Sequence, residues 1–133
     1  MDEVNKIHEQ IKEKVITAKE EWNIVTAAQL LDKHTIGSLI VTKDEKLVGI
    51  LTERDIIRSV VAKGLAPNKV LIKDVMTKNV VTADVKFGIK KIFEMLQKAP
   101  FRHLPIVDDG KPVGMVSKRD LLYLFDHKTD SVK

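Results

Sequence analysis

The chain of 133 residues contains no cysteine. This absence excludes disulfide frameworks, thiolate zinc sites and cysteine nucleophiles, and it is compatible with a reducing cytoplasm. No run of about 18 apolar residues is present that would span a bilayer. The first ten residues, MDEVNKIHEQ, are too polar for a signal peptide. We therefore expect a cytoplasmic protein without a membrane segment.

Aromatic residues make up only 5% of the chain, and its lysines are scattered rather than gathered in a basic stripe. Both features argue against nucleic-acid binding, and the net charge of +4 indicates a solvated surface more than an anionic partner. The four histidines have no metal-ligand spacing. No nucleophile elbow, Walker loop or catalytic triad order is visible. We expect no metal site and no enzyme activity.

What the sequence does contain is an internal repeat, the feature to look for before any fold is assigned. A shift of 65 positions aligns residues 15–57 with residues 80–122 without a gap. The phrase GILTERDII at 49–57 returns as GMVSKRDLL at 114–122. The chain therefore consists of two homologous copies, which we call the first and the second repeat.

The boundary between the copies is expected in the stretch 62–70, which contains glycine, proline and asparagine. This places a first unit at residues 1–64 and a second at residues 65–133. A unit of about 60 residues is only marginally stable on its own. Two small sheets that packed through their apolar faces would bury both faces.

Each repeat has the pattern strand, helix, strand, strand, helix. The expected strands are rich in β-branched residues and lie at 15–18, 38–42, 47–51, 80–83, 103–107 and 113–116. Apolar side chains with helical spacing predict the helices: Ile24, Ala27, Ala28 and Leu31; Ile56, Ile57, Val60 and Val61; Ile89, Ile92, Phe93 and Leu96; and Leu121, Leu122 and Phe125. We expect Gly37 and Pro100 to end the first helix of each repeat.

The repeated phrase has a structural interpretation. Thr52 with Asp55, and Ser117 with Asp120, have the spacing of a capping box, in which hydroxyl and carboxylate bind the free amides that open a helix. Gly49 can be explained as a small residue in a crowded strand. These contacts account for the glycine, the hydroxyl and the acid.

Capping does not explain Arg54 and Arg119, because a cation in the first helical turn faces the positive end of the helix dipole. A bound anion would offset that repulsion. Free amides, a hydroxyl and an arginine at a helix start suit phosphate, and a neighbouring carboxylate suits ribose hydroxyls. The pattern indicates a nucleotide.

With this tandem pattern, DVMTKNVVTA at 74–83 and RHLPIVDDGKPVGMVSKRDLL at 102–122, the chain resembles a tandem CBS domain pair, the Bateman module. The resemblance covers residues 7–125. It implies an α+β fold of two tandem β-α-β-β-α units packed sheet to sheet with pseudo-two-fold symmetry. It also implies a stand-alone regulatory module that binds AMP, ADP, ATP or S-adenosylmethionine in two clefts, a homodimer with apolar helix faces at the interface, and an effector protein that the sequence does not identify.

The family's ligand residues carry over by position. The two aspartates would hold ribose hydroxyls, the hydroxyls and cations of the phrase would meet phosphate, and the threonines of the first strands with the backbone before the second strands would border adenine. The expected ligand-binding residues are Thr17, Ile36, Gly37, Ser38, Thr52, Arg54, Asp55, Thr82, Phe101, Arg102, His103, Ser117, Lys118, Arg119 and Asp120.

Three positions of the second repeat favour phosphate where the first repeat does not: Arg102, His103 and Lys118 replace Gly37, Ser38 and Glu53. We therefore expect the second cleft to bind nucleotide phosphate more strongly. Nucleic-acid binding and a ligand-free oligomerisation scaffold are the alternative functions.

Overall fold

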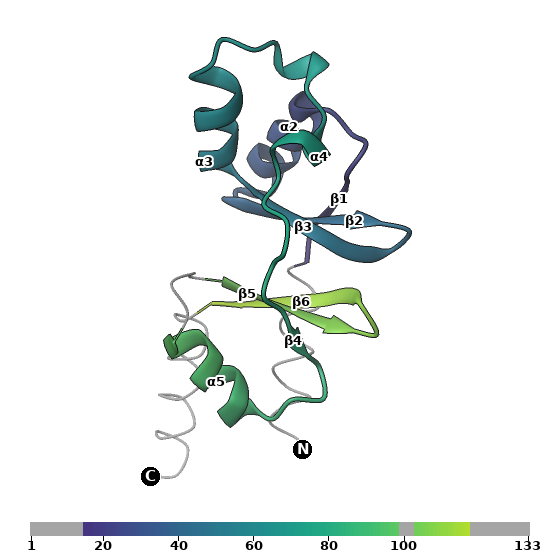
Figure 1. Ribbon diagram of the computed structural model, residues 1–133, viewed down its shortest axis with the longest axis vertical. Coiled ribbons are helices and arrows are strands. Elements are labelled where there is room, and N and C mark those ends of the chain that lie inside the picture. Colours follow the sequence, from purple (N-terminus) through teal and green to yellow (C-terminus); the bar gives the residue numbers. More distant parts are fainter. Residues whose placement is uncertain (1–14, 99–102, 118–133) are drawn as a thin grey trace. The chain divides into compact units, whose positions relative to one another are not determined.

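The computed structural model describes residues 15–98 and 103–117. It divides into two compact units. The first unit comprises Ile16–Val80, and the second comprises Val15 and the described residues from Val81 onward. Each unit contains a three-stranded sheet (Figure 1). The expected α+β class is confirmed.

The first unit has the predicted order of strand, helix, strand, strand and helix. Its elements are β1 (Thr17–Lys19), α2 (Ile24–His34), β2 (Ser38–Lys43), β3 (Lys46–Thr52) and α3 (Glu53–Ile56), which continues as the π-helix η1 (Ile57–Val61). Strand β2 is central, parallel to β1 and antiparallel to β3. Helices α2 and α3 lie on the same face of this sheet (Figure 1).

The second unit repeats this topology. Its described elements are β4 (Ala83–Asp84), α5 (Ile89–Lys98), β5 (His103–Asp108) and β6 (Lys111–Ser117). Strand β5 is central, and its register with β6 is that of the first unit: Ser38 pairs with Thr52, and His103 with Ser117. The closing helix predicted around Leu121 lies outside the described residues.

The two hairpins turn in the same way. Asp44 and Glu45 between β2 and β3 have φ angles of 51° and 68°, and Asp109 and Gly110 between β5 and β6 have φ angles of 52° and 80°. Positive φ at both central residues is the feature of type I′ turns, whose twist matches that of a β-hairpin. Each hairpin therefore reverses direction through a tight turn of two residues.

Helix α2 has a polar contact at each end. The Oδ1 atom of Asn23 accepts a hydrogen bond of 3.0 Å from the amide of Thr26, a standard N-cap contact. After the helix, Thr35 has a φ of 52°. The amide of Ile36 then donates to the carbonyl oxygen of Leu31 at 3.1 Å. This is the Schellman arrangement, which normally places glycine in the left-handed position.

The prediction that Gly37 ends α2 is wrong. The left-handed residue is Thr35, two positions earlier, and Gly37 has no positive φ. The backbone bond from Ile36 to Leu31 and the packing of both side chains in one apolar cluster hold this turn without a glycine. Pro100, expected to end the second helix, lies outside the described residues.

The segment between the repeats packs on the first unit. It contains the short helices η2 (Pro67–Lys69) and α4 (Ile72–Val75), and we call residues 67–77 the strap. Ile72 is fully buried in the apolar core of the first unit. The boundary between the two structural units falls after Val80 in the chain, whereas the sequence repeats suggested a boundary after residue 64.

Backbone hydrogen bonds hold the strap at two places. The amide of Ile72 donates to the carbonyl oxygen of Trp22 at 2.8 Å. Farther along, Thr77 and Ile50 exchange two bonds, of 2.8 Å from the Thr77 amide and 3.0 Å from the Ile50 amide. The strap thus contacts both the turn before α2 and the third strand of the sheet.

Each unit has its own core. In the first unit the fully buried side chains include Ile24, Leu39, Leu51, Val60 and Ile72, and in the second they include Ala83, Leu104 and Val116. The stripe predicted for α2 is buried at Ile24, Ala27 and Leu31. Ala28, the fourth residue of that stripe, is exposed because it borders a cavity.

Candidate functional site

The start of β2 and the end of β3 bring predicted ligand residues together. Ser38 and Thr52 are paired across the two strands. The amide of Glu53 donates a hydrogen bond of 2.9 Å to the carbonyl oxygen of Gly37. The segment expected to border adenine therefore lies beside the phrase that opens α3. We call this part of the first unit the Ser38–Thr52 edge.

The capping box is present in the first repeat. The Oγ1 atom of Thr52 accepts a hydrogen bond of 3.1 Å from the amide of Asp55. In return, the amide of Thr52 donates to Oδ2 of Asp55 at 2.9 Å. Among the residues that the structure describes, no partner binds the second carboxylate oxygen, Oδ1. The box thus fixes the Asp55 carboxylate and leaves one acceptor available at the Ser38–Thr52 edge.

Arg54 lies in the first turn of α3 and is exposed. Lys43 and Glu20 form an ion pair, whereas Arg54 takes part in none with a described residue. The repulsion between the Arg54 guanidinium and the positive end of the helix dipole is therefore not offset by a carboxylate of the described residues. The guanidinium is accessible to an anion from solution.

Gly49 has a packing role. A Cβ atom at this position would lie 2.7 Å from Sδ of Met76 and 2.8 Å from the carbonyl oxygen of Thr77, both in the strap. Real Cβ atoms do not approach neighbours so closely. The glycine of the first repeated phrase is thus explained by the strap that crosses β3, as the structural interpretation expected.

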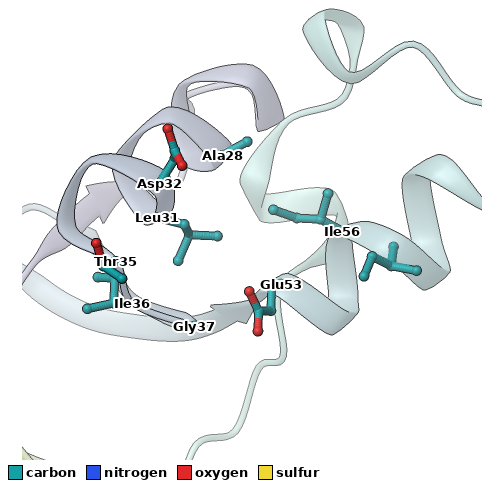
Figure 2. Close-up of a pocket in the computed structure, with 9 residues that line it drawn as sticks. Ala28, Leu31, Asp32, Thr35, Ile36, Gly37, Glu53 and Ile56 are labelled. Carbon is teal, nitrogen blue, oxygen red and sulfur yellow. The ribbon is translucent and has the colours of Figure 1, made fainter.

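A cavity of about 590 Å³ lies between α2 and α3 (Figure 2). Its volume is in the range of small-molecule sites. It is lined by Ala28, Leu31, Asp32, Thr35, Ile36, Gly37, Glu53, Ile56 and Ile57. Of the predicted ligand residues, Ile36 and Gly37 line it, whereas Thr52, Arg54 and Asp55 do not.

Most residues of this lining were not among the predicted ligand residues. Leu31 and Ile56 were assigned to apolar helix stripes, and Asp32 and Thr35 were not considered. They come together because the last turn of α2 ends beside the first turn of α3. The sequence feature that could have indicated the cavity is Ala28, because the second repeat has Phe93 at the equivalent position. A small side chain leaves space beside a helix.

The remaining predicted residues have separate positions. Thr17 lies in β1 and is exposed. It pairs with Ile40, which follows Ser38 by two residues in β2. Thr82 directly precedes β4. His103 is exposed and pairs with Ser117, as Ser38 pairs with Thr52. Five predicted residues lie outside the described residues: Phe101, Arg102, Lys118, Arg119 and Asp120.

The described residues contain no cluster of three or more histidine, aspartate or glutamate side chains that could hold a metal ion. None of the helices within residues 15–98 and 103–117 combines the length and the apolar character needed to cross a membrane.

Comparison with known proteins assigns the family. The CBS domain family model matches residues 5–62 and 72–127. The L-aspartate semialdehyde sulfurtransferase of Methanocaldococcus jannaschii is 40% identical over 115 residues, which are 85% of this chain and 22% of that protein. The inosine-5'-monophosphate dehydrogenase of Thermoplasma acidophilum is 37% identical over 109 residues, which are 81% of this chain and 21% of that protein.

A solved structure matches along nearly the whole chain. The crystal structure of the CBS domain protein NE2398 covers 97% of this chain and 98% of its own, with 32% identity and a TM-score of 0.73. The chain belongs to the CBS domain family, and its two repeats make it a CBS-pair regulatory module. It spans only about a fifth of the length of the two enzymes, 22% and 21%.

Proposed function

We propose that this CBS pair binds an adenosine-containing ligand and transmits its occupancy to an effector protein. The observation that carries the proposal is the Asp55 carboxylate at the Ser38–Thr52 edge. The capping box uses Oδ2, and Oδ1 has no partner among the described residues. This oxygen can accept hydrogen bonds from ribose hydroxyls, as an acidic residue does in dinucleotide folds.

The surroundings of Asp55 suit the rest of such a ligand. The cavity beside the edge offers the apolar side chains of Leu31 and Ile56 to a flat base. The backbone at Gly37 lies at the border of the same cavity. The exposed guanidinium of Arg54 provides a cation for an anionic substituent.

We also propose that the chain regulates and does not catalyse. The two enzymes that match it share only about a fifth of their length with it, 22% and 21%. Their match is accounted for by the CBS repeats, since the family model covers residues 5–62 and 72–127 of this chain. The activity in their names then belongs to the part that this chain does not match.

The proposed module is a cytoplasmic homodimer. Val61 and Leu65, at the end of η1 and just beyond it, are 63% and 47% exposed. Apolar side chains of this size on a surface are candidates for contact with a second copy. Light scattering of the Val61→Asp variant tests the proposal: we expect a monomer, and an unchanged mass would contradict this contact.

The proposed ligand is tested with two aspartate variants and a calorimetric panel of AMP, ADP, ATP and S-adenosylmethionine. Asp55→Asn keeps an oxygen for the Thr52 amide but replaces the second acceptor by a donor. We expect affinity to fall by about tenfold, the effect of losing one hydrogen bond to a charged group. The control is Asp44→Asn, with the same charge change in the hairpin turn, where the left-handed backbone tolerates asparagine.

Equal affinities of the two variants would contradict the assignment of Asp55. Absence of binding to any of the four ligands would contradict the proposed function itself. In that event, binding of oligonucleotides with a steep salt dependence would favour the nucleic-acid alternative, and absence of both would favour the scaffold.

A further inference from the structure

The net charge of the chain is concentrated in one segment of the first unit. Residues 57–80, from the start of η1 to the end of that unit, contain five basic side chains and one acidic side chain, Asp74. Their net charge of +4 equals that of the whole chain. All other residues together therefore carry as many acidic as basic side chains. We call residues 57–80 the basic segment, and its cations are Arg58, Lys63, Lys69, Lys73 and Lys78.

These five cations are accessible and unpaired. All of them are exposed, and none takes part in an ion pair with a described residue. The amide of Lys73 donates a hydrogen bond of 3.0 Å to the backbone carbonyl oxygen of Glu20. The Glu20 carboxylate, however, pairs with Lys43 at 3.6 Å, and its side chain is only 16% exposed. The acid that lies beside the strap is thus already engaged by another lysine.

The backbone that carries two of these lysines is fixed. The carbonyl oxygen of Val70 accepts a hydrogen bond of 3.0 Å from the first amide of α2, and the amide of Ile72 donates one of 2.8 Å to Trp22. Both contacts lie between Lys69 and Lys73. Figure 1 shows α4 on the side of the first sheet that α2 and α3 cover. Side chains on an anchored backbone lose less freedom when they bind a partner.

The composition of the basic segment suits carboxylates better than nucleic acid. Residues 57–80 contain no phenylalanine, tyrosine or tryptophan on which a base could stack. Four of the five cations are lysine, which acts as a point charge. Only Arg58 offers the planar fork that binds a phosphate through two parallel hydrogen bonds.

The strap is also a poor surface for an anionic membrane. Peripheral membrane binding combines cations with apolar side chains that enter the headgroup layer. The exposed large apolar side chains of the basic segment are Ile57, Val61 and Leu65, all of which precede the strap. Around Lys69 and Lys73 the strap exposes charge without such side chains. The partner that this surface fits best is an acidic protein segment.

We propose that the strap, through Lys69 and Lys73, docks an acidic segment of the effector protein. This inference rests on the proposed function in so far as that function includes an effector, and it specifies the chemistry of that partner. Opposite charge on the two surfaces speeds their encounter and selects the partner. The docking surface is separate from the proposed ligand site, since none of its five cations lines the cavity between α2 and α3.

The test uses a fluorescent peptide of alternating glutamate and glycine as the probe. Its anisotropy is measured while the full chain is added, without nucleotide, at about 0.15 M salt. A peptide with glutamine in place of glutamate is the matched probe. We expect saturable binding of the glutamate peptide alone, with an affinity that falls as salt is added, because exposed charge pairs are screened.

Two double variants with the same change in net charge locate the binding surface. Lys69→Gln combined with Lys73→Gln should raise the dissociation constant of the glutamate peptide by at least about tenfold. Lys90→Gln combined with Lys98→Gln, at exposed positions of α5, should raise it by less than about twofold. The fluorescence of Trp22, whose carbonyl oxygen binds the strap, verifies that the strap stays attached in both variants.

The outcomes separate this inference from the proposed ligand. If the glutamate peptide does not bind, or if both double variants weaken it equally, the inference is overturned and adenosine binding is unaffected. The same holds if the change at Lys69 and Lys73 weakens binding of phosphatidylserine vesicles or of a single-stranded oligonucleotide but not of the peptide. If the peptide binds with the expected difference between the variants and no adenosine ligand binds, the proposed ligand is overturned and the docking surface stands.

Discussion

Gly49 lies directly against Met76, so that a Cβ atom at position 49 would be only 2.7 Å from the Met76 sulfur. The carbonyl oxygen of Thr77 would be 2.8 Å away. The flexible methionine side chain can move aside, but the carbonyl is backbone and is held by the bonds between Thr77 and Ile50. The close approach of strap and sheet thus depends on the absence of a side chain.

We predict that Gly49→Ala lowers the free energy of unfolding by about 2 kcal/mol, the usual cost of overpacking a core position. Urea unfolding measures it. Gly88→Ala is the control, because no side chain of the described residues, apart from the neighbours of Gly88 in the chain, lies within 4 Å of the new methyl group. If Met76→Ala fully restores the stability of Gly49→Ala, the assignment of the clash to the Thr77 backbone is wrong.

Thr52→Ala removes the hydroxyl that accepts a hydrogen bond from the Asp55 amide. We expect the free energy of unfolding to fall by about 1 kcal/mol, the typical value of a helix N-cap. Thr52→Ser retains the hydroxyl and should stay within about 0.5 kcal/mol of the wild type. Thermal unfolding followed by circular dichroism distinguishes the variants, and equal losses for both would show that the methyl group, not the cap, stabilises this turn.

Ile72→Ala tests the attachment of the strap. Ile72 is fully buried, so we expect a loss of about 3 kcal/mol from the missing side chain and the space it leaves. Hydrogen exchange should then be faster at the amides of Thr77 and Ile50. Ile57→Ala is the matched control, because Ile57 is 59% exposed and its truncation should cost less than about 0.5 kcal/mol. Unchanged exchange at Thr77 in the Ile72 variant would contradict a strap held by its buried residue.

The two repeats should respond differently to the loss of their aspartates. We predict that Asp120→Asn weakens ATP binding more than Asp55→Asn does, because Arg102 and Lys118 belong to the second repeat and Glu53 to the first. Isothermal titration of both variants with ATP measures the difference. A loss of ATP binding in the Asp55 variant alone would reverse the ranking.

The order of elements was predictable because it depends on local patterns. The spacing of Ile24, Ala27 and Leu31 indicated a helix with one buried face, and the structure buries these three residues. The capping box of Thr52 and Asp55 was predictable for the same reason, since its two residues are three positions apart. A repeat at a fixed offset strengthened each prediction, because every pattern occurred twice.

Features that depend on packing were not predictable. Thr35 takes the left-handed position that the pattern assigned to Gly37, because the bond from Ile36 to Leu31 and their shared cluster fix that turn. The cavity joins Asp32 and Glu53, which belong to different helices, and their approach follows from how α2 and α3 pack. The spacing of residues along the sequence does not show how close Asp32 and Glu53 come in the fold.

The attachment of the strap determines where the gene can be divided. A truncated first unit that stopped after Gly64 would lose Ile72 from its interior and would expose the backbone of Ile50 that binds Thr77. A truncation that extends through Val80 retains both. Expression of the first unit by itself therefore calls for a stop codon after Val80, and the shorter fragment should be recovered in inclusion bodies.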